Sequence, residues 1–169
     1  MAGEKAETAG KKMLVVYYSW GGNTRVIAEQ IKALTGADIF EIEAREAYSS
    51  DYRTVVDQAK AEIQKGEVHA IKAMPANLAD YDVVFVGTPN WWSTMAPTVA
   101  AFLKEGDLAG KTVVPFVTHG GGGMARCEAD IVKMCEGAQT LKGFAVNGDA
   151  VESAGPGVRK WLQSIGIIK

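Results

Sequence analysis

The chain has 169 residues, a formal net charge of −2 at pH 7 and a hydrophobic fraction of 47%. This composition is ordinary for a globular protein, and the length is sufficient for one sizeable core. The small net charge gives no indication of a nucleic-acid partner. No apolar run approaches the ~20 residues that are needed to span a bilayer.

Residues 1–12 are polar and rich in Ala, Gly, Lys and Glu, without the apolar centre of a signal peptide. We expect them to be a disordered leader or an expression remnant, followed by a single domain over residues 13–169. Cys127 and Cys135 fall in one predicted helix, where their Cα atoms would be ~12 Å apart, too far for a disulfide. A reduced, cytoplasmic protein is the expectation.

Strands and helices alternate along the chain about five times. Strands are predicted over residues 13–18, 37–43, 83–87, 112–117 and 144–146. The run at residues 37–43 is the more exposed one, and the others are continuous apolar runs, which are typical of strands that are covered on both faces. Apolar residues at helical spacing predict helices that include residues 27–34, 52–63, 98–103, 125–134 and 158–165. Gly36 is placed to end the first helix, and Pro97 to open the third.

This alternation predicts one doubly wound α/β domain with a parallel sheet. In such a sheet, ligands bind beyond the carboxyl ends of the strands, where the strand order reverses. The loops that follow the strands are therefore the candidate site.

The first loop follows the strand at residues 13–18 and is rich in hydroxyl groups and glycine. It contains Ser19, Trp20, Gly21, Gly22, Asn23, Thr24 and Arg25. Free N–H groups and the dipole of the following helix would favour a phosphate here. The alternative is that Asn23 or Thr24 merely caps the helix. The loop has neither the Gly-Lys-Ser/Thr ending of a P-loop nor the spacing of a dinucleotide-binding turn.

The second loop follows the strand at residues 83–87 and carries two adjacent tryptophans. It contains Thr88, Pro89, Asn90, Trp91, Trp92 and Ser93. A large aromatic side chain at a loop tip can stack on a flat ligand, and Trp20 could supply a further aromatic wall. The alternative is that both indoles only pack against the sheet and a helix.

The third loop follows the strand at residues 112–117 and exposes its backbone. It contains Thr118, His119, Gly120, Gly121, Gly122 and Gly123. Backbone N–H and C=O groups without side chains suit the edge of a heterocycle. His119 could hydrogen-bond such a ligand, protonate a substrate or anchor the loop as a neutral imidazole. A flexible loop tip is the alternative.

Together the loops predict a ligand with a phosphate at one end and a flat ring at the other. From residue 13 onward the chain resembles a flavodoxin-type FMN protein, and the residues at 19–24, 88–93 and 118–123 carry the resemblance. The resemblance implies a five-stranded sheet in the order 2-1-3-4-5 with FMN at its carboxyl edge. It also implies that the phosphate is held by Ser19, Gly21, Asn23 and Thr24, the ring by Pro89, Asn90, Trp91 and Trp92, and the pyrimidine edge by Thr118, Gly120, Gly121 and Gly122.

The resemblance implies electron transfer between redox partner proteins, because the chain has no room for a separate substrate domain. The alternative is a small FMN-dependent NAD(P)H or quinone-type reductase. The third loop lacks the tyrosine that usually stacks on the outer ring face in this family, which would leave space for a quinone-like acceptor. The second loop has Asn90 where the family usually has a glycine.

Two further functions are alternatives. His119 and the glycines after it match an esterase oxyanion motif, but Tyr17 replaces the first elbow glycine before Ser19, and no triad order can be assembled. A non-redox FMN-binding sensor is the other. We expect no metal site, a surface position for His69, and a solvated helix face for Glu62.

Overall fold

The computed structural model describes residues 11–169. Residues 1–10, which make up most of the predicted leader, lie outside the described residues. Lys12 adjoins the sheet, because its backbone N–H donates to Asp82 Oδ2 at 2.9 Å. No helix within residues 11–169 is both long and apolar enough to cross a membrane.

A parallel sheet forms the centre of the molecule, in the order β2-β1-β3-β5 followed by a last position that β6 and β7 share. Its strands are β1 (Met13–Tyr17), β2 (Asp38–Glu41), β3 (Val83–Trp91), β5 (Thr112–His119), β6 (Gln139–Thr140) and β7 (Phe144–Asn147). The predicted order 2-1-3-4-5 is thus confirmed. The two short strands β6 and β7 pair with the beginning and the end of β5, where one strand was expected.

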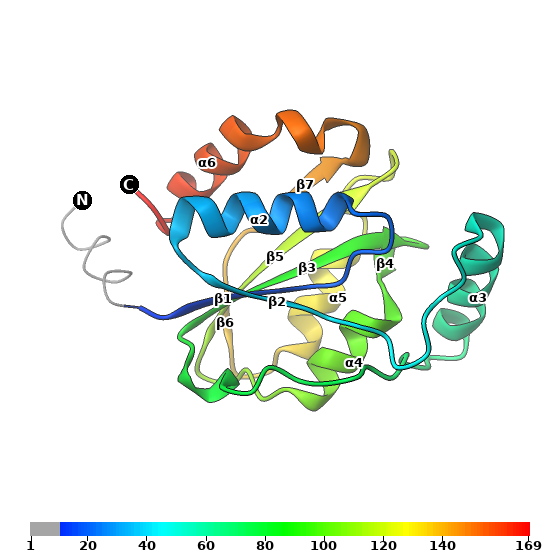
Figure 1. Cartoon of the computed structure of the whole chain (residues 1–169). Helices are drawn as coiled ribbons and strands as arrows, with labels where there is room; N and C mark the ends of the chain where they lie inside the picture. The colour runs from blue at the N-terminus through cyan, green and yellow to red at the C-terminus, as the bar shows by residue number, and fades with distance from the viewer. Residues whose placement is uncertain (1–10) are drawn as a thin grey trace.

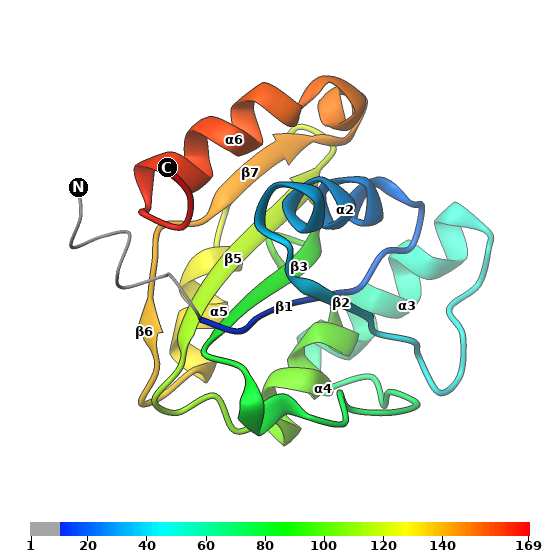
Figure 2. The same cartoon turned by 60° about the vertical axis from the view of Figure 1, so that its left-hand side comes forward.

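Helices cover both faces of the sheet, and one helix stands apart from it. They are α2 (Asn23–Thr35), α3 (Tyr52–Gln64), α4 (Pro97–Glu105), α5 (Cys127–Met134) and α6 (Gly155–Ser164), with short 3-10 turns at Leu78–Asp80 and Gly148–Ser153. Helices α2 and α6 lie on one face, and α4 and α5 on the other (Figure 1). Helix α3 lies beyond the carboxyl end of β1, near the loop that leads into α2 (Figures 1 and 2).

The core has two halves because successive side chains of a strand point to opposite faces. Val16 packs in a cluster with Phe102 of α4 and Ile131 of α5. Val15 packs in the other cluster with Ile27 of α2. The central strands are therefore buried on both faces, as their continuous apolar runs predict.

The second predicted loop begins later than expected. Strand β3 was predicted to end at Gly87, but it continues to Trp91 and turns back into a short antiparallel strand, β4 (Thr94–Met95). The turn residues Trp92 and Ser93 have φ angles of 55° and 71°. Two positive φ angles are typical of a two-residue hairpin turn, which usually contains Asn-Gly. The Trp-Ser sequence therefore gave no indication of it.

Two expectations about helices and cysteines are confirmed. Gly36 ends α2 in the left-handed conformation at φ 76°. Cys127 and Cys135 are both free and buried, and burial raises the pKa of Cys127 to about 12. An inert thiol follows, because the thiolate is the reactive form.

Gly87 is the position in the sheet where a methyl group has least room. A Cβ built on Gly87 would lie 2.2 Å from Cζ of Phe116 on the neighbouring strand. We expect Gly87→Ala to lower the free energy of unfolding by about 1–3 kcal/mol, because the ring must move in a packed core. Urea denaturation measures this loss.

Gly155→Ala is the matched control, since a Cβ there meets no atom within 4 Å. Its effect should stay within about 0.5 kcal/mol. Equal stabilities of the two variants would contradict the close packing at Gly87.

Candidate functional site

A cavity of about 580 Å³ lies at the carboxyl edge of the sheet, where the three predicted loops meet. From those loops it is lined by Ser19, Trp20, Gly21, Asn23, Thr24, Pro89, Asn90, Trp91, Trp92, Thr118, His119 and Gly120. The volume is within the range of ~300–1,000 Å³ that is typical of small-molecule sites.

Two further segments line the cavity and were missed by sequence reasoning. One is the inner face of α3, with Tyr52, Val55, Val56 and Ala59, and the other is the turn after β7, with Asn147, Gly148 and Asp149. The turn could have been found, because it is a polar segment that follows the last predicted strand. The apolar stripe on α3 could not have been found, because apolar residues at the same spacing also occur on a helix that packs only against the core.

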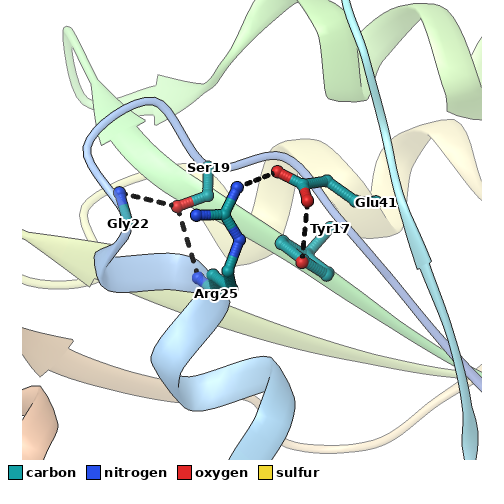
Figure 3. A network of polar contacts seen from close by, with 5 residues as sticks. All are labelled: Tyr17, Ser19, Gly22, Arg25 and Glu41. Atoms are coloured by element: carbon teal, nitrogen blue, oxygen red, sulfur yellow. Dashed lines mark hydrogen bonds and ion pairs between the residues drawn. The ribbon is translucent and has the colours of Figure 1, made fainter.

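The first loop forms a tight turn around one hydroxyl group. Ser19 Oγ accepts hydrogen bonds from the backbone N–H of Gly22 at 3.0 Å and of Arg25 at 3.3 Å (Figure 3). Gly22 has φ 100°, which disfavours a side chain. A Cβ on Gly21 would meet no atom within 4 Å, so its backbone faces open space. The N-cap of α2, Gly22, has no side chain, and Ser19 Oγ takes only the N–H of Arg25 in the first turn, which leaves the N–H groups of Asn23 and Thr24 for a ligand.

The Arg25 side chain, which was predicted to bind the ligand, is not among the residues that line the cavity. It forms an ion pair with Glu41 of β2, whose carboxylate also accepts a hydrogen bond from Tyr17 Oη at 3.2 Å (Figure 3). The hydrogen bond that the Arg25 guanidinium donates to Glu41 is the largest cause that raises the pKa of Arg25. The charge of Arg25 is therefore neutralised outside the cavity, and its backbone N–H is bonded to Ser19 Oγ.

A buried hydrogen bond joins the first loop to the third. The hydroxyl groups of Thr24 and Thr118 are 2.8 Å apart, and both residues are 2% exposed. Beside them, a Cβ on Gly148 would lie 2.4 Å from Asn23 Nδ2, so only glycine allows the turn after β7 to approach α2. These contacts fix three loops around the polar end of the cavity.

The second and third loops also hold one another. Asn90 Nδ2 donates to the carbonyl of Gly123 at 2.9 Å. Thr88 is fully buried, and its hydroxyl accepts from Ala96 N–H at 2.9 Å. The carbonyl of Ser93 accepts from Arg126 N–H.

Among the predicted site residues, those outside the cavity lining are Gly22, Arg25, Thr88, Ser93, Gly121, Gly122 and Gly123.

His119 has a defined tautomer. Its Nδ1 accepts a hydrogen bond from the Gly121 backbone N–H at 3.0 Å. Since a backbone N–H can only donate, the proton of the neutral imidazole lies on Nε2. His119 lines the cavity and is thus a potential donor to a ligand.

Aromatic rings form the other end of the cavity. Trp91 meets Tyr18 and Tyr48 edge to face, with centroids 5.7 and 5.1 Å apart. Trp20 Nε1 donates to Ser49 O, and Trp92 Nε1 to Val56 O, both at 3.0 Å. The two indoles therefore tie the ligand loops to α3 and to the segment before it.

The fold and the cavity together define a doubly wound protein with a site for a ligand that is polar at one end and flat at the other. The flavodoxin family matches residues 12–165, and the chain belongs to this family. The expectation from the sequence is thereby confirmed, and FMN is the cofactor that this family implies.

Solved structures share the fold over most of the chain. A protein from Bacteroides eggerthii, provisionally described as a flavoprotein, is 30% identical with a TM-score of 0.79, covering 92% of this chain and 98% of that one. A flavoprotein from Lactobacillus acidophilus, solved in complex with FMN, is 23% identical with a TM-score of 0.73, covering 90% of this chain and 99% of that one.

A curated relative from Caulobacter vibrioides, named NAD(P)H dehydrogenase (quinone), is 35% identical over 127 residues. The match covers 65% of this chain and 59% of the relative. The chain thus spans only part of the length of this relative.

The residues present fit FMN. Gly21 and Gly120 line the cavity, and a Cβ on either would meet no atom within 4 Å, so backbone groups at both positions can approach a ligand. Hydroxyl and amide donors suit the phosphate and the polyol chain, and indole rings suit a flat heterocycle. Within residues 11–169, no group of three or more His, Cys, Asp or Glu could hold a metal ion.

The Thr24–Thr118 pair makes a test of the polar end. We expect Thr24→Val to lower the free energy of unfolding by about 1–3 kcal/mol, because it leaves the Thr118 hydroxyl buried without its partner. The double variant Thr24→Val/Thr118→Val should be more stable than the sum of the single losses predicts. Denaturant unfolding of the unchanged protein, the two single variants and the double variant gives the four free energies of unfolding that this comparison needs. If the losses of the two single variants add up to the loss of the double variant, the two hydroxyl groups do not interact.

Proposed function

We propose that this protein binds FMN in the cavity at the carboxyl edge of the sheet and acts as an electron-transfer flavoprotein. The observation that supports this most is the convergence of separate loops on one cavity with a polar end and an aromatic end. That the Lactobacillus flavoprotein, which shares this fold, was solved with FMN supports the choice of ligand.

In this proposal the phosphate lies at the N-terminus of α2. Ser19, Asn23 and Thr24 donate from their side chains, and Gly21 donates from its backbone. The positive φ of Gly22 shapes the turn. Since Glu41 neutralises Arg25, the phosphate is held by neutral donors and the helix dipole.

The flat ring lies toward the aromatic end, against Trp91 and Pro89. Gly120 meets its polar edge, where His119 donates from Nε2, while Thr118 stays at the polar end beside Thr24. When bound, FMN supplies reversible one- and two-electron redox chemistry. The protein positions the ring and excludes water around it.

One side of this end stays open to solvent. Trp92 lines the cavity and is 45% exposed. A redox partner that approaches Trp92 can come close to the ring, so redox partner proteins are the proposed partners. The free, buried cysteines fit a reducing compartment, and we propose the cytoplasm.

The second candidate is a small FMN-dependent NAD(P)H or quinone-type reductase. The observation that favours it is the α3 wall, whose cavity residues Tyr52, Val55, Val56 and Ala59 carry no charge. A neutral, flat acceptor such as a quinone suits this wall. The name of the Caulobacter relative points in the same direction.

The geometry does not favour a hydrolase. Ser19 Oγ contacts the backbone N–H groups of Gly22 and Arg25, while His119 is bonded to Gly121. Neither arrangement pairs a nucleophile with a base. A non-redox FMN sensor would bind FMN without transferring electrons.

FMN binding is tested by titrating the purified protein with FMN and following flavin fluorescence and absorption. We expect saturable binding of one FMN. His119→Asn should weaken it by roughly two- to tenfold, because the amide oxygen still accepts from Gly121 N–H but the Nε2–H donor is lost. His119→Ala, which removes both groups, should weaken binding further.

If His119→Asn binds FMN as tightly as the unchanged protein, His119 serves only to anchor the loop. A protein that takes up no FMN at all would contradict the proposed function.

Electron carrier and reductase are separated by supplying NAD(P)H with and without a quinone. We expect the FMN-loaded protein to accept electrons from an added flavodoxin reductase and to consume little NAD(P)H alone. Steady consumption of NAD(P)H that depends on the quinone would select the second candidate. The absence of any redox change under either condition would select the sensor.

A further inference from the structure

Behind the aromatic end of the cavity, three polar side chains form a buried cluster. Tyr48 and His69 are each 8% exposed, and the side chain of Glu62 is 16% exposed. Tyr48 Oη donates to Glu62 Oε1 at 2.5 Å. His69 Nδ1 lies 2.6 Å from Glu62 Oε2, and its Nε2 lies 2.7 Å from the Glu46 carbonyl. The surface position expected for His69 and the solvated face expected for Glu62 are therefore wrong.

The partners of His69 define its protonation. A carboxylate and a carbonyl oxygen can only accept, so either neutral tautomer leaves one ring nitrogen facing an oxygen lone pair. Unsatisfied contacts of this kind are costly in a buried site. The arrangement is complete only when a proton also lies between Nδ1 and Glu62. Burial, and next the hydrogen bond to Glu62, raises the pKa of Tyr48, which stays a donor.

The cluster fastens α3 to the body of the protein. Glu62 lies in the last turns of α3, which stands off the sheet in Figure 1. His69 follows α3, and its backbone N–H donates to the Pro97 carbonyl at the start of α4 at 3.1 Å. The carboxylate of Glu62 is thus one polar link between α3 and the body of the protein, through the imidazole of His69.

The cluster also reaches the cavity. The ring of Tyr48 stacks on His69 with centroids 4.1 Å apart, and it meets Trp91 edge to face at 5.1 Å. Trp91 lines the cavity, as do Val55 and Ala59 on the inner face of α3. A change at His69 therefore acts on two parts of the same wall.

We propose that His69 is a positioning residue that, as an imidazolium, holds α3 and Trp91 in place as a wall of the ligand cavity, so that ligand affinity depends on its protonation. The inference rests on the proposed function only for the identity of the ligand, FMN. The groups around the ring are Glu62 from α3, and Tyr48 and the Glu46 carbonyl from the preceding segment, while the Pro97 carbonyl of α4 holds the backbone N–H of His69. Glu62 is the carboxyl group in direct contact, so the arrangement with a proton on both ring nitrogens exists at low pH and is lost as pH rises.

Glu62→Gln is the matched variant that tests this. The amide N–H can donate to Nδ1 of a neutral His69, its oxygen can accept from Tyr48, and Nε2–H can donate to Glu46. We expect the unchanged protein to lose FMN affinity roughly three- to tenfold, with faster exchange of the α3 amides relative to α2, as pH rises from ~6 to ~9. Glu62→Gln should keep its affinity and its relative α3 protection over this range.

His69→Gln supplies a second variant. The amide of this variant cannot donate to both the Glu62 carboxylate and the Glu46 carbonyl in the geometry of the imidazole. The FMN affinity of His69→Gln should therefore be lower than that of the unchanged protein at pH ~6 and should change little with pH. Nitrogen NMR of the imidazole should show both ring nitrogens protonated at pH ~7 in the folded protein.

A neutral His69 at that pH, or the same pH profile for the unchanged protein and Glu62→Gln, would overturn the inference. If neither protein binds FMN, the proposed function fails, while the imidazole spectrum and the α3 amide exchange still decide the role of His69.

Discussion

Parallel pairing of β1, β3 and β5 is the constraint on which the candidate site depends. The register sets Tyr17 beside Gly87 and Gly87 beside Phe116, so three strands deliver their loops to one edge. Gly87 makes this possible, because the ring of Phe116 occupies the space that a side chain would need. Close packing at one glycine in the sheet therefore determines how near the first, second and third loops come to one another.

The parts of the fold that follow from local pattern could be predicted from the sequence. Strands that are buried on both faces carry nearly continuous apolar runs, and residues 13–17, 83–86 and 113–117 show such runs without any tertiary information. The order of the loops along the chain then gives the site, since parallel strands share a carboxyl edge. Most of the cavity wall contributed by those loops was accordingly named in advance, from Ser19 to Gly120.

What could not be predicted depends on contacts between distant residues. Arg25 looks like a phosphate ligand in the sequence, but Glu41 lies on the adjacent strand β2 and pairs with it. Val55 and Ala59 form an ordinary amphipathic stripe, and the sequence does not show that this stripe faces a cavity. His69 stands in a polar segment, and its burial arises only when Tyr48 and Glu62 fold against it.

Helix α3 is held by two kinds of contact. The indole of Trp20 donates to the carbonyl of Ser49 before the helix, the indole of Trp92 donates to that of Val56 within it, and Lys60 lies over the ring of Trp92 at 4.9 Å. Trp92 holds its place at a positive φ, a conformation that is unfavourable for a bulky residue. Toward its end, the helix is held by the buried carboxylate of Glu62. The two contacts differ in exposure, since Trp92 is 45% exposed and the side chain of Glu62 is 16% exposed. The polar network at Glu62 is therefore the more sheltered attachment of α3, and the contact at Trp92 is the one that solvent and a partner can reach.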